Sequence, residues 1–486
     1  MTKYIINPHF VLRHAKTKTF ILTRPDYGTK PIISVIHPIY GMMLSFFNGI
    51  EKETAYNQIA NLLELPIDKV QKQLDMLIDN PEPIHNGMST FPPHFLIEYK
   101  EGDTRHNYTY TDFLYENVDL CMGRLDAPSD IICNLTLRCV TSCIYCYADR
   151  KNNMDKQMPI ELIEKILDEA KEIGVVHFKL MGGEVLLYKG WERIVEKMVG
   201  YGYQPDISTK YPMTEEQLNN WKKMRATKSP IQISLDTLIK EHLYEILRVK
   251  DPYYDAIINT FNLMEKLEIN YVVHTVISNR NDLVEDIKSL YNFFKGKKHL
   301  LNWMFDPAKC SMYNGLEYKA YKTNRTALEN INKYIDQINQ EKSFDFTLKK
   351  PQLMLDFNLV PKEERIRKFP NRRMCSGNLN AMYILPDGQV TICEELYWHP
   401  RFLLGDLKKQ TIMEVWNSQK AKDLFYLQQN TIQKSSPCAT CEDFAECRKY
   451  KHICWRETIL AYGKDKWDYP DILCPKAPLI NKDIVI

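Results

Sequence analysis

A run of three cysteines is the first feature of the sequence whose spacing suggests chemistry. In RCVTSCIYCYADR (138–150), three residues separate Cys139 from Cys143, two separate Cys143 from Cys146, and the stretch holds no fourth cysteine. A closed structural site, whether for zinc or for iron–sulfur, uses four ligands. Three thiolates can bind three irons of a [4Fe–4S] cube, so the incomplete set indicates that an external molecule completes the coordination. A zinc site completed by a distant histidine is the alternative that the spacing leaves open.

The other cysteines divide into a C-terminal cluster and three isolated residues. The chain has 13 cysteines, and Cys121, Cys133 and Cys310 stand alone, which favours a buried structural role for each of them. Nothing in the sequence points to export, and in a reducing compartment clustered thiols more often bind metal than form disulfides. We therefore expect metal ligands among the clustered C-terminal cysteines, which are Cys375, Cys393, Cys438, Cys441, Cys447, Cys454 and Cys474.

Length and composition are those of a large cytoplasmic enzyme. The 486 residues correspond to roughly three domains at about 150 residues each. The 64 basic and 62 acidic residues give a net charge of +2, which provides no global field to attract nucleic acid. No apolar run approaches the roughly 20 residues that span a bilayer, and the N-terminus lacks the apolar core of a signal peptide. We expect a cytoplasmic protein without a nucleic-acid or membrane partner.

The elements before residue 115 have the order of a winged helix-turn-helix. Residues 10–23 predict a strand, a turn and a second strand. Residues 32–80 have the apolar spacing of three short helices, and 94–114 favour an extended hairpin. This fold binds either DNA or peptides, and the nearly balanced charge of the helices argues against DNA.

From about residue 130 the pattern changes to strand, loop and helix in alternation. Such alternation argues for a parallel sheet, closed or partly closed into a barrel, with its chemistry on loops at the carboxyl ends of the strands. The cysteine loop leaves its strand at that side, and after residue 315 the pattern gives way to a loop-rich tail. The predicted strands lie within 130–137, 175–187, 203–210, 231–237, 271–278 and 300–306.

The cysteine triplet and a turn after it resemble the radical S-adenosylmethionine (SAM) superfamily. The signature of that superfamily is CxxxCxxC with an aromatic residue before the last cysteine, here Tyr145. MGGE, at 181–184, follows the next strand, where the family places a Gly-Gly-Glu turn that binds the methionine amino group of SAM. The resemblance implies that the triplet holds a catalytic [4Fe–4S] cluster whose open iron binds SAM. An ordinary strand-to-helix turn would explain the two glycines but not their position.

The same resemblance implies further SAM contacts. Gly182 and Gly183 would let backbone carbonyls approach the ammonium closely, and Glu184 would add a negative charge. Ser208 and Ser234, which end later strands, would reach the ribose or the carboxylate of SAM.

Two more assignments have plain structural alternatives. Asp236 would lie near SAM, but it could equally be a helix N-cap. Arg248, in ILRVKDPYY, stands where many relatives carry an arginine that binds the SAM carboxylate. A surface ion pair is the alternative for this arginine.

The C-terminal cysteines resemble a SPASM extension. Residues 375–393 match its opening pattern, C-x(9–15)-G-x4-C, with Gly388 as the glycine. Cys438, Cys441 and Cys447 match the later C-x2-C-x5-C element. SPASM regions bind two auxiliary iron–sulfur clusters, so the resemblance implies two sets of ligands. The first auxiliary group is Cys375, Cys393 and Cys454, and the second auxiliary group is Cys438, Cys441, Cys447 and Cys474.

The first auxiliary group departs from the commonest pattern. Six residues separate Cys447 from Cys454, where the commonest pattern has three. No cysteine lies between Cys375 and Cys393, where some relatives place a further ligand. Either Cys310 or a non-cysteine side chain closes this cluster, or one iron stays open and binds a substrate thiol.

The resemblance also gives the N-terminal domain a role. Among SPASM relatives, peptide maturases often carry a winged-helix domain, the RiPP recognition element, which binds the leader of a ribosomally made precursor peptide. The leader adds a strand to the small sheet and lies against the third helix, here 66–78. A domain that caps the barrel or mediates dimerisation is the alternative.

Taken together, these resemblances imply an α/β fold. It would contain a partial (β/α)6 TIM-type radical SAM barrel, an N-terminal winged-helix domain and a C-terminal loop-rich SPASM iron–sulfur domain. The expected boundaries are 1–115 for the winged-helix RiPP recognition element and its linker, 116–320 for the barrel, 321–365 for a helical bridge and 366–486 for the SPASM domain.

The implied function is that of a radical SAM peptide maturase. Its cofactors would be the catalytic [4Fe–4S] cluster, SAM and two auxiliary clusters, with an external electron donor such as a flavodoxin or ferredoxin. SAM cleavage would give a 5′-deoxyadenosyl radical that removes hydrogen from the peptide core. A thioether crosslink is favoured, and a carbon–carbon crosslink, a carbon–oxygen crosslink and epimerisation are alternatives.

Two other classes of protein fit parts of the sequence. A sulfatase-maturing enzyme, which oxidises serine or cysteine to formylglycine, resembles the tail but needs no leader-binding domain. A zinc-binding winged-helix regulator would use the N-terminal domain and the cysteines without any SAM chemistry.

Overall fold

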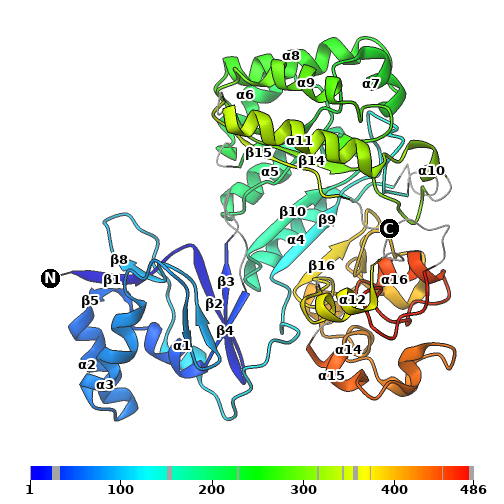
Figure 1. Ribbon diagram of the computed structural model, residues 1–486. Helices are drawn as coiled ribbons and strands as arrows, with labels where there is room; N and C mark the ends of the chain where they lie inside the picture. The colour runs from blue at the N-terminus through cyan, green and yellow to red at the C-terminus, as the bar shows by residue number, and fades with distance from the viewer. Residues whose placement is uncertain are drawn as a thin grey trace. The chain divides into compact units, whose positions relative to one another are not determined.

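A computed structural model describes residues 2–24, 33–149, 156–226, 229–314, 317–341, 344–353, 360–372, 374–450 and 453–480. The chain divides into two compact units, 1–129 and 130–486 (Figure 1). The first unit extends past the expected boundary at residue 115. The expected boundaries at 320 and 365 fall inside the second unit and stay predictions. Within the described residues, no helix is both long enough and apolar enough to cross a bilayer.

The N-terminal unit combines small antiparallel sheets with short helices. β2 (Phe10–Ala15) and β3 (Lys18–Thr23) form the predicted strand–turn–strand, and β4 (Ile33–Ile36) pairs with β3. Helices α2 and α3 each bury side chains four residues apart, such as Val70 and Leu74 of α3, which places one face of each helix on the core. The helices expected between residues 32 and 80 form as α1 (Pro38–Leu44), α2 (Lys52–Leu63) and α3 (Ile67–Leu74).

The prediction of a hairpin over 94–114 is wrong. In this segment β8 (Leu96–Glu98) pairs with β1 (Lys3–Ile6), and the other edge of β1 pairs with β5 (Asn48–Glu51). The chain beyond β8 forms turns and a 3-10 helix at Tyr110–Phe113. Phe113 packs in the core at 1% exposure, whereas Thr109, Tyr110 and Thr111, which favoured a strand here, are exposed.

A hairpin does form earlier in the chain, between α3 and β8. β6 (Ile84–Asn86) and β7 (Ser89–Phe91) are antiparallel, with Asn86 opposite Ser89. Gly87 opens the two-residue turn with a φ of +58°, a conformation that glycine adopts without strain. The Asn86-Gly87 pair is a strong hairpin signal that the sequence analysis did not use.

Every strand predicted for the second unit is present. The helices between them include α4 (Ile160–Glu172), α5 (Trp191–Gly200), α7 (Lys240–Leu247) and α8 (Tyr253–Lys266). They bury apolar faces against the strands in one continuous core. The strands are β9 (Asp130–Asn134), β10 (His177–Met181), β11 (Ser208–Thr209), β12 (Ile231–Ser234), β13 (Tyr271–Ile277) and β14 (Leu300–Pro307).

These strands do not form one continuous sheet in the part of the chain that is described. One parallel sheet has the order β11-β12-β13-β14-β15, where β15 is Thr347–Lys349. The other has the order β10-β9-β16-β17-β18 and joins the first two strands to the C-terminal tail (Figure 1). β11 has only two residues and pairs with β12, so no ladder connects it to β10. The expected partial barrel is therefore divided between β10 and β11.

The C-terminal tail contributes its own strands and short helices. β16 (Ala381–Ile384) lies parallel to β9, and β17 (Gln389–Thr391) and β18 (Leu403–Asp406) follow as an antiparallel meander. The tail is otherwise built from turns and helices of eight residues or fewer, such as α16 (Trp455–Tyr462). Residues 354–359 of the expected helical bridge lie outside the described residues.

Candidate functional site

A cavity of about 340 Å³ lies where strands of both sheets in the second unit end. Its walls come from the cysteine loop, the turn after β10, and the strands β11, β12 and β13. Asp236 and Arg248 are not among its lining residues. The predicted site residues that line it are Cys139, Cys143, Tyr145, Cys146, Gly182, Gly183, Glu184, Ser208 and Ser234.

The cysteine loop is held from two directions. The Thr141 hydroxyl lies 3.4 Å from Cys139 Sγ and 3.2 Å from Cys143 Sγ. The backbone N–H groups of Ser142 and Ile144 donate to the last carbonyls of α7, with N–O distances of 2.8 and 2.9 Å. Burial raises the pKa of Cys143 to about 11, and the positive charge of Lys210 opposes that rise. The loop is thus fixed by α7 and presents its thiols to the cavity.

The Gly-Gly turn packs directly on the backbone that leads into this loop. A Cβ atom on Gly183 would lie 2.4 Å from the carbonyl oxygen of Arg138, and one on Gly182 would lie 2.7 Å from that of Thr136. Real Cβ atoms do not approach so closely, so only glycine fits at either position. The glycines therefore allow a close contact between two backbone segments, which is a different reason from the approach to an ammonium that we expected.

Glu184 connects the two sheets at the cavity. Its carboxylate is 2% exposed and accepts hydrogen bonds from Leu186 N, Thr209 Oγ1 and Lys210 N at 3.1, 2.8 and 3.2 Å. Burial raises the pKa of this carboxyl group, and the three hydrogen bonds oppose the rise. Because no ladder joins β10 to β11, these bonds tie the two strands together where the sheet is divided.

Tyr145 and Asp236 form a buried pair beside the cysteine loop. The Tyr145 hydroxyl donates to Asp236, which is fully buried and also accepts from Val276 N at 2.9 Å. Burial and the nearby Asp236 hold the pKa of Tyr145 well above its ordinary value. The helix after this strand begins at Lys240 with Ile239 as its N-cap, so Asp236 is not a helix cap. Its contact is with the aromatic residue of the cysteine motif.

The lysines that line the cavity are Lys179 and Lys210, and the predicted Arg248 is not among its lining residues. Arg248 is exposed and ends α7 in a left-handed conformation, with a φ of 54°. Lys210 lines the cavity, and its Nζ lies 5.6 Å from the centre of the Tyr145 ring. The sequence analysis missed Lys210, although it directly follows the Ser208-Thr209 strand end that was used.

Other polar residues inside the cavity were also missed. Lys179, Gln232 and His274 line it from β10, β12 and β13. Gln232 Nε2 donates to Ser208 Oγ at 2.5 Å, and His274 Nε2 lies 3.2 Å from Asp306. In the sequence these residues are polar side chains at alternate positions of otherwise apolar strands. Because successive side chains of a strand point to opposite faces, such residues share one face, and this pattern could have identified them.

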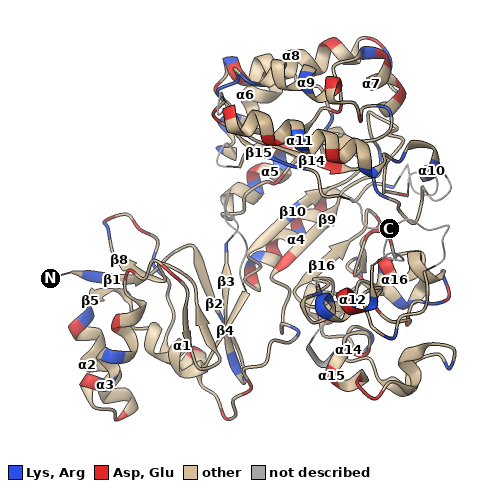
Figure 2. Ribbon diagram, viewed as in Figure 1, with Lys and Arg blue, Asp and Glu red and all other residues tan. Residues whose placement is uncertain are grey.

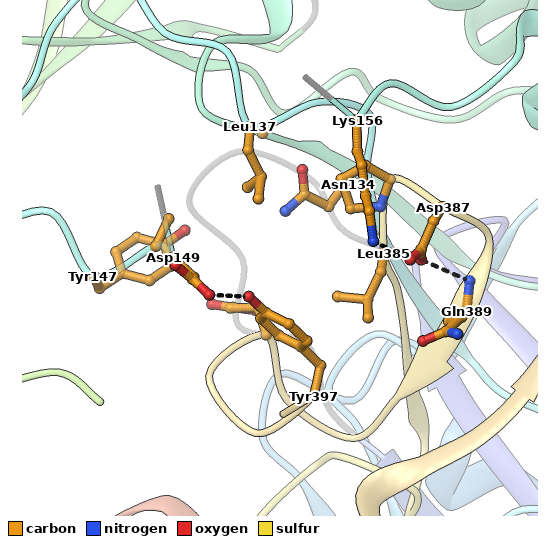
Figure 3. Close-up of a pocket in the computed structure, with 13 residues that line it drawn as sticks. Asn134, Leu137, Tyr147, Asp149, Lys156, Leu385, Asp387, Gln389 and Tyr397 are labelled. Atoms are coloured by element: carbon orange, nitrogen blue, oxygen red, sulfur yellow. Dashed lines mark hydrogen bonds and ion pairs between the residues drawn. The ribbon is translucent and has the colours of Figure 1, made fainter. Parts of the chain in front are cut away.

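A second cavity, of about 130 Å³, borders the first (Figure 3). Tyr147, Ala148 and Gly182 line both cavities. Across it, the Tyr397 hydroxyl donates to Asp149, and Lys156 Nζ lies 3.0 Å from Asp387. These two contacts join the residues that follow the cysteine motif to the tail around β16 and β17 (Figure 3).

The first auxiliary group comes together in the structure. Burial raises the pKa of Cys454 to about 12, and the charges of Glu457 and Cys375 add to that rise. Burial likewise holds the pKa of Cys393 well above its ordinary value, with contributions from Glu394, Glu395 and Cys375. Cys375 therefore lies near both Cys393 and Cys454.

Arg456 links Cys310 to Glu395, which lies beside the first auxiliary group. Burial raises the pKa of Cys310, and the charged groups that act on it are Arg456 and Glu395. The Arg456 guanidinium donates to the Cys310 carbonyl and to the Glu395 carboxylate. Whether Cys310 closes the first cluster stays a prediction.

The second auxiliary group also comes together. Burial raises the pKa of Cys474 to about 11, with further contributions from the charges of Cys438, Cys447 and Cys441. Cationic side chains lie at three of these thiols. Arg372 Nη2 is 3.3 Å from Cys447 Sγ, Lys476 Nζ is 3.4 Å from Cys441 Sγ, and Arg448 Nη2 is 3.9 Å from Cys438 Sγ.

The arrangement of these cysteines fits clusters better than single ions. Among the described residues, no group of three His, Cys, Asp or Glu side chains could hold one metal ion. In a [4Fe–4S] cluster each thiolate binds its own iron, so the sulfur atoms need not converge on one point. Arg372 Nε and Arg448 Nη1 are buried and have no hydrogen-bond partner, and the sulfide of a cluster would supply acceptors there.

Two family models match the chain. Residues 133–294 match the radical SAM superfamily, and residues 375–442 match SPASM, an iron–sulfur cluster-binding domain. The radical SAM domain implies a [4Fe–4S] cluster and SAM, and the SPASM domain implies auxiliary iron–sulfur clusters. The assignment of individual cysteines to the three clusters stays a prediction, and Cys447, Cys454 and Cys474 lie beyond the matched residues.

Curated relatives cover part of the chain. "Probable GTP 3',8-cyclase" of Methanothermobacter thermautotrophicus (strain Delta H) is 23% identical over 261 residues, which is 54% of this chain and 82% of the relative. The protein of the same name from Methanothermobacter marburgensis is 35% identical over 118 residues, which is 24% of this chain and 38% of the relative.

Solved structures of Streptococcus suis SuiB share the fold along nearly the whole chain. SuiB bound to S-adenosylmethionine aligns with 99% of this chain and 100% of its own, at a TM-score of 0.64 and 13% identity. SuiB bound to the precursor peptide SuiA aligns with 100% of both chains, again at 0.64 and 13%. The chain therefore contains a radical SAM domain, which makes it an enzyme of that superfamily, and a SPASM domain, and the likeness to SuiB shows that the fold is shared along nearly the whole chain.

Proposed function

We propose that this enzyme is a peptide maturase that binds the leader of a ribosomally made precursor and installs a crosslink in its core. One observation carries the proposal. The fold matches SuiB over the full chain, N-terminal unit included, and SuiB has been solved bound to the precursor peptide SuiA. An enzyme whose substrate needed no leader would not require the additional 129-residue unit.

The cofactor site would be built from the residues around the larger cavity. Cys139, Cys143 and Cys146 would hold the catalytic cluster, and Ser208 and Ser234 would contact SAM from the strand ends. When bound, the cluster and SAM supply a 5′-deoxyadenosyl radical that removes a hydrogen atom from the substrate. The protein's contribution is to place the two reactants and to exclude water.

Lys210 takes the role that the sequence analysis gave to Arg248. Its ammonium lines the cavity and its charge acts on Cys143, so it is suited to bind the SAM carboxylate. Asp236 holds the Tyr145 hydroxyl and thereby fixes the ring between two cluster ligands. Glu184 keeps the ends of β10 and β11 in register with each other through Thr209 and Lys210.

The leader would bind at the N-terminal unit by strand addition beside α3. Apolar side chains at both ends of α3 are exposed, with Leu65 at 37%, Ile67 at 40% and Met76 at 38%. Acidic and basic residues are mixed along α2 and α3 (Figure 2). Such a surface suits an amphipathic peptide better than it suits a strongly charged partner.

A thioether is the crosslink that the first auxiliary group favours. This group offers three thiols, so a cysteine of the core peptide can provide the fourth. A bound substrate thiolate would then lie next to the site of hydrogen abstraction. Carbon–carbon and carbon–oxygen crosslinks need no substrate thiol. If the enzyme forms either of them, no substrate thiolate would be needed as the fourth ligand of the first auxiliary cluster.

A nucleotide is the second candidate substrate. The curated relatives named as probable GTP 3',8-cyclases support it, because they match 54% of this chain in one case. A GTP-converting enzyme would not depend on the N-terminal unit, so the two candidates differ in a measurable way.

The experiment compares both substrates in one anaerobic assay. Reconstituted enzyme, SAM and dithionite are mixed either with a Cys-containing precursor encoded next to this gene or with GTP. We expect the precursor to lose about two hydrogens by mass and to lose one alkylatable thiol. The core peptide without its leader, and the full precursor with a Lys210→Gln enzyme, are the controls and should react much more slowly. Turnover of GTP with no change in the peptide would overturn the proposal.

A further inference from the structure

The second auxiliary group is surrounded by hydrogen-bond donors that carry positive charge. Arg372 and Lys476 lie within 3.4 Å of Cys447 and Cys441, and Arg448 lies 3.9 Å from Cys438. Three of the four thiols of this group therefore face a cation. None of the three basic residues was singled out by the sequence analysis.

The two arginines are fixed in these positions. Arg372 is 8% exposed, donates from Nη1 to the Phe369 carbonyl at 3.1 Å, and lies 4.0 Å from the centre of the Phe369 ring. Arg448 is 9% exposed and lies 5.5 Å from the centre of the Trp455 ring. Each also has a buried N–H group without a partner, namely Arg372 Nε and Arg448 Nη1. Unpaired buried donors are costly, so these groups point to acceptors that the cluster would bring.

Lys476 differs because its side chain is half exposed. Its Nζ lies 2.9 Å from Asp443, whose side chain is 75% exposed. Asp471 is the buried carboxyl near the two arginines, and burial raises its pKa. Glu442 and Glu446, which adjoin Cys441 and Cys447 in the sequence, are exposed like Asp443. Solvent therefore screens these carboxylates, whereas the two arginines are buried.

The first auxiliary group has different surroundings. Glu394 directly follows Cys393, and Arg456 lies two residues after Cys454. The Arg456 guanidinium is paired with the buried Glu395 carboxylate. This cation is therefore held by a carboxylate, whereas the three cations of the second group lie at its thiols.

We propose that Arg372, Arg448 and Lys476 donate to the thiolates of the second auxiliary group and hold its cluster at a higher reduction potential than that of the first. Net charge and hydrogen bonds to sulfur set the potential of an iron–sulfur cluster. Reduction adds one negative charge, which nearby cations stabilise and nearby carboxylates destabilise. An electron that reaches the SPASM domain passes from the first group, which is oxidised, to the second group, which is reduced.

The test is a potentiometric titration of the reconstituted full chain, followed by electron paramagnetic resonance. Cys139→Ala, Cys143→Ala and Cys146→Ala form the background, so that only the auxiliary clusters contribute. No peptide is needed, and the result is therefore independent of the proposed substrate. We expect two components, and Lys476→Gln should shift only the one of higher potential.

In the Lys476→Gln variant, the ratio of reduced to oxidised cluster at a fixed potential should fall about tenfold. This fall corresponds to a decrease of about 59 mV in the one-electron reduction potential. Lys476→Arg should restore the ratio, and Lys409→Gln, which removes an exposed lysine after β18, should leave it unchanged. Arg372→Gln should act in the same direction if its iron and sulfide content equals that of the background. A shift of the lower component, or a shift no larger than that of Lys409→Gln, would overturn the proposal.

Discussion

The two auxiliary cysteine groups lie in one domain but differ in the cations near their thiols. Arg372, Arg448 and Lys476 lie at three thiols of the second group, whereas Arg456 near the first group is paired with Glu395. Glutamates adjoin ligands of both groups in the sequence, namely Glu394 in the first and Glu442 and Glu446 in the second. The difference therefore depends on which charged side chains the fold brings to the sulfur atoms, and not on the residues next to the ligands.

The first group has three cysteines and the second has four. Because of this difference, removing one cysteine should have the largest effect of all the changes considered, namely on the iron content. Cys375→Ala leaves two thiols in the first group, which cannot hold a cluster, and should remove about four irons per chain. Cys438→Ala leaves three thiols in the second group, the same number that the catalytic loop uses, and should remove much less. Iron and sulfide analysis after anaerobic reconstitution measures both. Equal losses of iron from the two variants would contradict the difference in ligand number between the two groups.

Ion pairs at the two groups should differ in their effect on stability. Glu395 in the first group is buried, so Arg456→Gln leaves an unpaired buried charge and should destabilise the protein by about 3–5 kcal/mol. Lys476 and Asp443 in the second group are exposed, so Lys476→Gln should cost about 0–1 kcal/mol. Anaerobic chemical denaturation compares the two variants. A double variant, Glu395→Gln with Arg456→Gln, should recover part of the first loss, and an additive loss would contradict the pairing.

The strand end beside the first group should show a pH-dependent stability. His177 lies 3.2 Å from Asp130 and 3.3 Å from Asp206, and Asn380, between Cys375 and β16, donates to Asp130 at 2.7 Å. Burial lowers the pKa of His177, but the two carboxylates outweigh burial and raise it to about 9.

Because the folded pKa exceeds the ordinary 6.5, this stabilisation is fully present below pH 6.5. This stabilisation amounts to about 3 kcal/mol and is lost as the pH rises towards about 9. The stability difference between the wild type and His177→Gln, measured by denaturation at a series of pH values, should shrink across that interval. A difference that stays constant with pH would show that His177 is not charged in the folded protein.

The smallest effect concerns the potential of the first group. Glu457→Gln removes a negative charge near Cys375 and Cys454 and should raise the reduced fraction of the lower-potential component about threefold at a fixed potential. Glu329→Gln, which changes an exposed glutamate paired with Arg325, is the matched control. The same spectroscopic titration detects the change, and a response in the higher-potential component would assign Glu457 to the wrong group.

Features set by local spacing could be predicted from the sequence. The strands of the second unit and the cysteine triplet follow from short patterns, and the structure has the strands and places the triplet at one cavity. The two auxiliary groups were also proposed from short patterns, and their role as cluster ligands stays a prediction. The position of MGGE after β10 was clear as well, and the carbonyls of residues 136–138 add a reason for its glycines that the sequence did not show.

Features that depend on distant contacts could not be predicted. Arg248 was chosen by resemblance and Lys210 was not considered, because the position of each side chain relative to the cavity depends on how distant strands and helices pack. The division of the barrel depends on β16 pairing with β9 across about half of the chain. The partner of Asp236 is Tyr145, which no local pattern around Asp236 reveals.

The most direct measurement is the release of 5′-deoxyadenosine by the reconstituted enzyme with SAM and dithionite under argon. Sustained release by the wild type is expected, together with none from the variant that lacks all three cysteines of the catalytic loop but keeps its auxiliary iron. Equal release from the two proteins would contradict the assignment of SAM cleavage to Cys139, Cys143 and Cys146.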